Sequence, residues 1–208
     1  YIEMTLAQMK HFGIQAQADW ANGTIEIPSQ TYTLQPFAVE SDWSGASYWY
    51  SIVALSPFED SSLELLGLKE DSLQGDSAIK AMMEPLGVKS TYTGRGYLLT
   101  KTPAQTSLAW DFTDCPDLAQ TICVIAAVKN ISLTLTGLES LKVKETDRVI
   151  ALQNELKKLG ATLTEKEANH LYEVKGDFAA VSTIEPIETY DDHRMAMAFA
   201  PVAMQKEI

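Results

Sequence analysis

The chain has 208 residues, of which 46% are hydrophobic and 9% aromatic, a composition that allows one or two cores and excludes a disordered chain. Its longest apolar run, residues 121–128, is too short for a membrane helix. Its net charge of -12 opposes contact with a nucleic-acid backbone, so we expect neither nucleic acid nor a membrane as a partner.

The first predicted element is an amphipathic helix at residues 1–12. Its first residue, Tyr1, is not an initiator methionine. The segment also lacks the charged, apolar and small-residue regions of a signal peptide. We therefore expect the chain to begin inside a domain.

Three predicted helices end in a bulky residue followed by glycine, at Gly13, Gly87 and Gly160. Glycine in this position adopts the left-handed conformation that closes a helix. The three glycines are 74 and 73 residues apart, and a strand-like run such as residues 161–164 follows each one. This spacing indicates an internal repeat.

A second series has the same period. Asp42, Asp117 and Asp192 each precede a helical apolar segment, and they are 75 and 75 residues apart. Aspartate is a favoured N-cap because its carboxylate accepts the first free N–H groups of a helix. We predict all three as N-caps.

Short alternating or β-branched runs lie between the predicted helices, at residues 24–27, 62–65, 88–92, 97–100, 107–112, 131–136 and 170–174. Gly94-Arg95-Gly96 lies between two of these runs and predicts a hairpin turn, because no third glycine and no helix follow it. Each unit would hold two helices and roughly four strands, which indicates an α/β (α+β) fold. Pro36 interrupts the chain before Asp42, and we predict a domain boundary near residue 40.

The segment 142–148 holds three basic residues within an acidic chain and leads into a helical run at 149–159. On a helix, Lys144 and Arg148 would be i,i+4 neighbours and Glu145 would lie i,i+3 from Arg148. Together with the positive end of the helix dipole, this pattern predicts an anion site. A solvated first turn with internal ion pairs explains the pattern equally well.

The segment 190–199 places His193 and Arg194 at the first helical positions after Asp192. Basic residues destabilise a helix N-terminus, so their presence indicates a function there. For His193 alone, a surface or orienting role is favoured over a catalytic one. The apolar residues that follow predict core packing.

A third segment, 111–117, precedes the helix at 118–128, and its pattern alone favours a simple cap role for Asp117. Cys115 and Cys123 have no histidine or cysteine partners at zinc-ligand spacing. We predict that both are small buried residues, in keeping with a reducing cytoplasm, and that the protein needs neither a metal nor an organic cofactor.

The motifs Lys144-Glu145-Thr146-Asp147-Arg148, Pro116-Asp117 and Asp192-His193-Arg194-Met195-Ala196-Met197, taken in order, resemble those of 5-enolpyruvylshikimate-3-phosphate synthases. Tyr1-Ile2-Glu3-Met4-Thr5-Leu6 and Leu73-Gln74-Gly75-Asp76 extend the resemblance over the whole chain. It implies an inside-out α/β barrel of repeated βαβαββ units. Residues 1–40 would end the first of two enolpyruvyltransferase-like domains, and residues 41–208 would form most of the second.

The resemblance also implies a reaction, in which the carboxyvinyl group of phosphoenolpyruvate moves to the 5-hydroxyl of 3-phosphoshikimate. Asp117 would accept the hydroxyl proton and Glu145 would transfer a proton at the methylene carbon. Further roles follow for Tyr1, Lys144 and Ser140 beside 3-phosphoshikimate, for Lys144, Arg148 and Arg194 around phosphoenolpyruvate, and for Asp192 and His193 as supporting residues. The two small molecules would be the partners of a monomeric, cytoplasmic parent enzyme.

The sequence departs from the family pattern in two ways. Ser140 stands where the family commonly has an asparagine that contacts the shikimate ligand. The chain also lacks the N-terminal segments and the C-terminal lysine that the family uses for both ligands, so we expect the fragment alone to be inactive. Two alternatives remain open: a non-catalytic binding or assembly module of the same fold, and a carboxyvinyltransferase that acts on a UDP-linked sugar.

Overall fold

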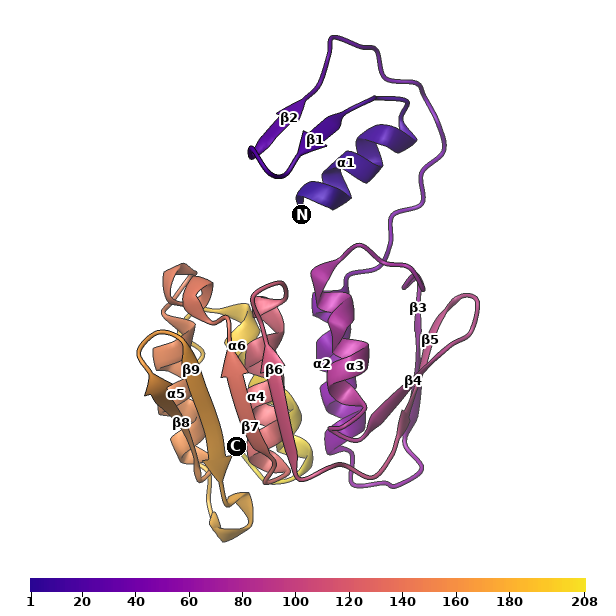
Figure 1. Ribbon diagram of the computed structural model, residues 1–208. Coiled ribbons are helices and arrows are strands. Elements are labelled where there is room, and N and C mark those ends of the chain that lie inside the picture. The colour runs from indigo at the N-terminus through magenta and orange to yellow at the C-terminus, as the bar shows by residue number, and fades with distance from the viewer.

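The computed structural model describes residues 1–208, in which helices and strands alternate (Figure 1). The α helices are α1 (Ile2–His11), α2 (Trp43–Leu55), α3 (Ile79–Met83), α4 (Ala119–Val128), α5 (Arg148–Lys158) and α6 (His193–Phe199). The strands are β1 (Gln17–Asp19), β2 (Thr24–Glu26), β3 (Ser62–Leu66), β4 (Val88–Tyr92), β5 (Gly96–Lys101), β6 (Ser107–Asp111), β7 (Ser132–Thr136), β8 (Ala161–Glu167) and β9 (Leu171–Gly176). Five short 3-10 helices complete the chain: η1 (Gly75–Ala78), η2 (Pro116–Leu118), η3 (Glu139–Val143), η4 (Phe178–Ala180) and η5 (Ala200–Met204).

The predicted repeat is confirmed. The elements from β6 to β9 form one βαβαββ unit whose sheet has the order β6-β7-β9-β8, with β6 parallel to β7 and the other pairs antiparallel. The elements from α2 to β5 repeat this pattern without its first strand, in the order β3-β5-β4. Gly13, Gly87 and Gly160 close equivalent helices at φ +85, +95 and +72.

The helices form the interior of the unit, as an inside-out α/β fold requires. All ten residues of α4 are buried, and this helix contacts α2, α5 and α6. Helices α2 and α3 lie between the two larger sheets in Figure 1. The hydrophobic core is one continuous cluster of 45 buried residues. No helix combines the length and the apolar character needed to cross a membrane.

Both cysteines are buried and carry free thiols, as predicted. Burial raises the pKa of Cys115 to about 11, and complete burial raises the pKa of Cys123 further. A thiol is reactive only as its thiolate, so neither cysteine is poised for chemistry at neutral pH.

The first forty residues stand apart from the rest of the chain in Figure 1. They hold α1 and the β1–β2 hairpin, and α1 has no buried residue. Strand β1 is the strand-like run predicted after Gly13, and its three residues pair with β2. Residues 27–42 join this part to α2 without a regular element. The boundary near residue 40 falls in this segment and stays a prediction.

Two predicted helix starts are corrected by the structure. Asp42 and Asp192 do cap α2 and α6, but Asp117 lies within η2 and accepts no helix N–H group, because its carboxylate faces two arginines. Helix α5 begins only at Arg148, because the side chain of Asp147 caps it. Lys144 therefore lies before the helix in an extended conformation.

A glycine pair tests how tightly the βαβαββ unit is built. Gly137, after β7, has φ +76, and a Cβ there would lie 2.3 Å from the backbone nitrogen of Thr113. Gly94, in the predicted hairpin turn, has φ +81 but open space around it. Because both positions carry the left-handed strain and only one carries the clash, we expect Gly94→Ala to cost about 1 kcal/mol and Gly137→Ala about 3 kcal/mol. Equal decreases in the free energy of unfolding, measured in urea, would contradict this packing.

Candidate active site

Charged residues from three distant segments meet where α4, α5 and α6 begin. Asp117 lies in the 3-10 turn that leads into α4, and Arg148 is the first residue of α5. Asp192 caps α6, and Arg194 occupies its first turn. Helix α4 contacts both α5 and α6, so the packing of the three helices places these side chains together.

The guanidinium of Arg148 is the centre of this cluster, and its side chain is only 2% exposed. Its Nε donates to Asp192 Oδ2 at 2.7 Å, and its Nη1 donates to Asp117 Oδ1 at 3.1 Å. Its Nη2 donates to Glu145 Oε2 at 2.6 Å and to Asp192 Oδ1 at 3.3 Å. A buried charge is tolerated when it is paired in this way, so the arginine fixes three carboxylates in one geometry.

Both carboxylate oxygens of Asp117 face cations. Arg194 Nη2 lies 3.0 Å from Oδ2, and Lys144 Nζ lies 3.8 Å from Oδ1, the oxygen that also accepts from Arg148. These cations hold the carboxylate in a fixed orientation. Asp117 is therefore suited to accept a hydrogen bond from a ligand.

The cluster shifts the proton affinities of its members. Burial raises the pKa of Asp192, but the hydrogen bond and charge of Arg148, together with backbone N–H groups at the start of α6, outweigh burial and hold the pKa below its ordinary value. Burial also disfavours the charge of Arg194, but Asp117, Tyr48 and Asp76 together outweigh that effect and raise the pKa of the guanidinium. Asp192 and Arg194 are thus charged at neutral pH.

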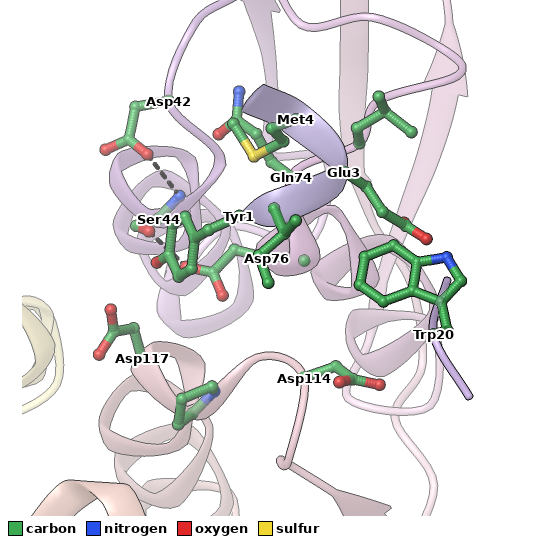
Figure 2. A pocket seen from close by; sticks show the side chains of 14 residues that line it. Tyr1, Glu3, Met4, Trp20, Asp42, Ser44, Gln74, Asp76, Asp114 and Asp117 are labelled. Carbon is green, nitrogen blue, oxygen red and sulfur yellow. Dashed lines mark hydrogen bonds between the residues drawn. The ribbon is translucent and has the colours of Figure 1, made fainter. Parts of the chain in front are cut away.

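An open cavity of about 820 Å³ adjoins Asp117 (Figure 2). Residues of α1 and Trp20 line one side, and residues from α2, η1 and the turn before α4 line the other. Its five acidic lining residues are Glu3, Asp42, Asp76, Asp114 and Asp117, and no lysine, arginine or histidine lines it. Within the cluster, only Asp117 lines the cavity, and the three cations contact the Asp117 carboxylate without lining the cavity themselves.

Asp76 and Ser44 also belong to this cavity, although the sequence pattern did not single them out for chemistry. Asp76 is buried and accepts a hydrogen bond from the Ser44 hydroxyl. Burial raises its pKa. The available signal was Gly75-Asp76, a glycine and an acid directly before a helical run.

The anion site at the start of α5 stays a prediction, and the structure shows two features there that the sequence pattern did not indicate. The free N–H groups of Val149 and Ile150 already bind Asp147 Oδ1, at 3.1 and 3.0 Å. Lys142 Nζ lies 3.8 Å from Glu165 on β8, outside the cluster. The cap therefore occupies two of the free N–H groups at this helix start, so any anion bound there would depend on the side chains of Lys144 and Arg148.

The remaining predicted site residues lie around the cluster. The side chain of Glu145 is 53% exposed although it touches Arg148. Tyr1 is exposed and lines the cavity. Ser140 in η3 and His193 in α6 are exposed, and neither side chain hydrogen-bonds to another part of the chain.

Comparison with known proteins places this geometry in context. Residues 1–208 match the family described as EPSP synthase (3-phosphoshikimate 1-carboxyvinyltransferase). The 3-phosphoshikimate 1-carboxyvinyltransferase of Bacteroides fragilis is 48% identical over 206 residues, which is 98% of this chain and 49% of that protein. The protein of the same name from Idiomarina loihiensis is 34% identical over 210 residues, covering 98% and 46% of the two chains.

A solved structure has the same fold. The EPSP synthase from Acinetobacter baumannii matches with a TM-score of 0.74 at 20% identity, covering 96% of this chain and 47% of that chain. At this identity the match supports the fold alone. The chain spans about half the length of the curated relatives that it matches.

The cluster predicts a large cost for the loss of Arg148. In Arg148→Met, Asp192 stays buried without its cation, while Asp117 keeps Arg194 and Lys144, so we expect the free energy of unfolding to fall by roughly 3–5 kcal/mol at pH 7. Because Arg148 lowers the pKa of Asp192, the stabilisation is present above the unfolded carboxyl pKa of about 3.9 and is lost as the pH falls through the lower folded value. The difference between the wild type and the variant should therefore shrink in acid.

The matched control is Arg95→Met, which removes an ion pair to Glu64 of 2.8 Å from a side chain that is 70% exposed. An exposed pair contributes only about 0–1 kcal/mol. Urea unfolding of both variants between neutral and acidic pH measures the two effects. Similar decreases in the free energy of unfolding in both variants would show that the buried Arg148 cluster matters no more to stability than an exposed ion pair.

Proposed function

The chain belongs to the EPSP synthase family, and we propose that the protein of which it is a part transfers the carboxyvinyl group of phosphoenolpyruvate to the 5-hydroxyl of 3-phosphoshikimate. The observation that carries this proposal is the Asp117 carboxylate, held at the cavity between Arg148 and Arg194. A positioned anion of this kind is what an attacking hydroxyl needs.

The reaction requires proton transfer at two atoms. A proton added to the methylene carbon of phosphoenolpyruvate makes the neighbouring carbon electrophilic, and the hydroxyl oxygen then bonds to that carbon while losing its own proton. Phosphate leaves with its bonding electron pair, and the new methyl group returns a proton. The chemistry therefore calls for a base at the hydroxyl, an acid at the methylene carbon and cations around the anionic groups.

The site offers a residue for each task. We assign the hydroxyl proton to Asp117, because both its oxygens face cations and it reaches the cavity. Glu145 is assigned to the methylene carbon, because its carboxyl group is half exposed and can reach a ligand. Lys144 is extended beside Asp117, where its ammonium group can contact both substrates.

Arg148 and Arg194 are assigned to phosphoenolpyruvate, and they differ in how many hydrogen-bond donors each has available. Arg194 has one ion pair, so several of its donors are available for paired hydrogen bonds to a carboxylate or phosphate. Arg148 makes four hydrogen bonds to carboxylates, and Glu145 is the exposed partner that a ligand could displace. Asp192 and His193 support this helix start, and Tyr1 and Ser140 are assigned to the shikimate side.

The proposed domain division follows the same geometry. We propose that residues 1–40 end one domain and residues 41–208 form most of a second. The cavity supports this division, because Tyr1 and Trp20 line it from one side and Asp76 and Asp117 from the other.

We propose that the intact enzyme is monomeric and cytoplasmic and that its partners are the two small substrates. The acidic cavity supplies no cation of its own, so we propose that this chain alone does not turn over.

Two alternatives make different predictions. A non-catalytic module would have no use for Asp117 and Glu145 beside buried arginines. A carboxyvinyltransferase acting on a UDP-linked sugar would bind the nucleotide sugar in preference to 3-phosphoshikimate. Calorimetric titration of the full-length enzyme with both compounds separates the two substrates.

The proposed base gives the sharpest test. In the full-length enzyme, Asp117→Asn keeps the shape of the side chain but removes its charge, so kcat should fall by about 10²–10⁴. The rate is measured as phosphate released from phosphoenolpyruvate when both substrates are present. The isolated chain should release no phosphate above background.

Asp114→Asn is the control, because Asp114 lines the same cavity, is exposed and touches no arginine. We expect its kcat within about threefold of the wild type, as for an exposed charge that pairs with no residue of the cluster. Unchanged turnover in Asp117→Asn would favour the non-catalytic module.

A further inference from the structure

The segment that presents Asp192 and Arg194 has no regular structure of its own. Residues 181–191 connect η4 to α6, and most of them are exposed. The positions of Asp192 and Arg194 therefore depend on how this segment is held. Backbone without ladder hydrogen bonds needs other contacts to keep a defined geometry.

The end of this segment is in a disfavoured conformation. Tyr190 and Asp191 have φ values of 57 and 52, in the left-handed region. Such a conformation is uncommon for a bulky side chain, and two successive residues persist in it only where their surroundings hold them. They directly precede Asp192, which bonds Arg148 and caps α6.

The carboxylate of Glu155 holds the part of the segment next to these two residues, while Lys158 Nζ donates to the Pro186 carbonyl further from them, at 2.7 Å. Glu155, which lies on α5, is only 1% exposed. Its Oε2 accepts from the Glu188 N–H at 2.9 Å and from Lys158 Nζ at 2.7 Å, and its Oε1 accepts from the Tyr190 hydroxyl at 2.9 Å. One buried side chain thus binds the segment at two points beside the left-handed residues.

Glu155 and Arg148 act from the same helix face. They are seven residues apart, which is about two turns of α5. Arg148 holds Asp192 from the first turn, and Glu155 holds Tyr190 from further along. Because both come from one rigid helix, the distance between their two points of attachment is fixed. The site described above uses only the Arg148 end of this arrangement.

We infer that Glu155 is a positioning residue, which sets the place of Arg194 beside Asp117 by tethering Tyr190. The inference rests on the proposed function, because Arg194 is assigned there to an anionic substrate. A buried glutamate with a purely stabilising role would instead affect unfolding and leave the site unchanged. The experiment must separate these two roles.

The test uses three variants of the full-length enzyme. Glu155→Gln keeps the size of the side chain but cannot accept all three hydrogen bonds, and Tyr190→Phe removes only the tethered hydroxyl. Leu163→Ala is the matched control, since it removes buried side-chain volume from β8, the strand that packs on α5, and leaves the tether intact. We expect KM for phosphoenolpyruvate to rise about tenfold in the first two variants, more than kcat falls, and to stay within about twofold in the third.

A second readout does not depend on turnover. Amide hydrogen exchange of residues 185–194 should become faster in Glu155→Gln and Tyr190→Phe but not in Leu163→Ala. If the wild type shows no synthase turnover, the proposed function fails while the exchange data still report the tether. KM and exchange unchanged in both tether variants, or changed equally in all three, would overturn the inference. Tyr190→Phe keeps the test valid if Glu155→Gln does not fold.

Discussion

The guanidinium of Arg148 lies out of water among three carboxylates, and the arrangement of the candidate site depends on that ion-pair network. Asp192 fixes the start of α6, Asp117 lies at the turn before α4, and Arg148 itself begins α5. Burying these charges costs desolvation energy, and the attraction between them offsets that cost only while every partner is present. It therefore acts less as a source of net stability than as a geometric constraint, because the loss of one partner leaves the others buried and unpaired.

The repeat explains why these residues can meet. Each unit places a helix start about 75 residues after the previous one, and the buried helix α4 contacts both α5 and α6. Helix starts that lie close together bring their first residues together, and one capping residue, Asp192, is an ion-pair partner of Arg148 as well. The same helix α5 extends this control along its length, with Arg148 at the site and Glu155 at the segment that leads to it. Within the cluster, Asp117 is the group that lines the cavity.

Much of the fold could be predicted because its signals are local. The left-handed glycines at 13, 87 and 160 and the caps at Asp42 and Asp192 depend on a few neighbouring residues, and the structure confirms them. Asp117 has the same local pattern and was wrongly predicted as a cap, because arginines 31 and 77 residues away claim its carboxylate. Pattern reasoning does not see such long-range pairs. The second error was to place Lys144 on a helix. Asp147 caps α5, so the helix begins at Arg148, after Lys144.

The most direct test of the constraint is a double-mutant cycle between Arg148 and Asp192, built from Arg148→Met, Asp192→Asn and the double variant, with unfolding free energies measured in urea at pH 7. Residues that share one buried ion pair should show a coupling energy of about 2 kcal/mol or more. The double variant should then be far less destabilised than the sum of the single variants predicts. Additivity within about 0.5 kcal/mol would contradict the account, because it would mean that the two side chains act independently.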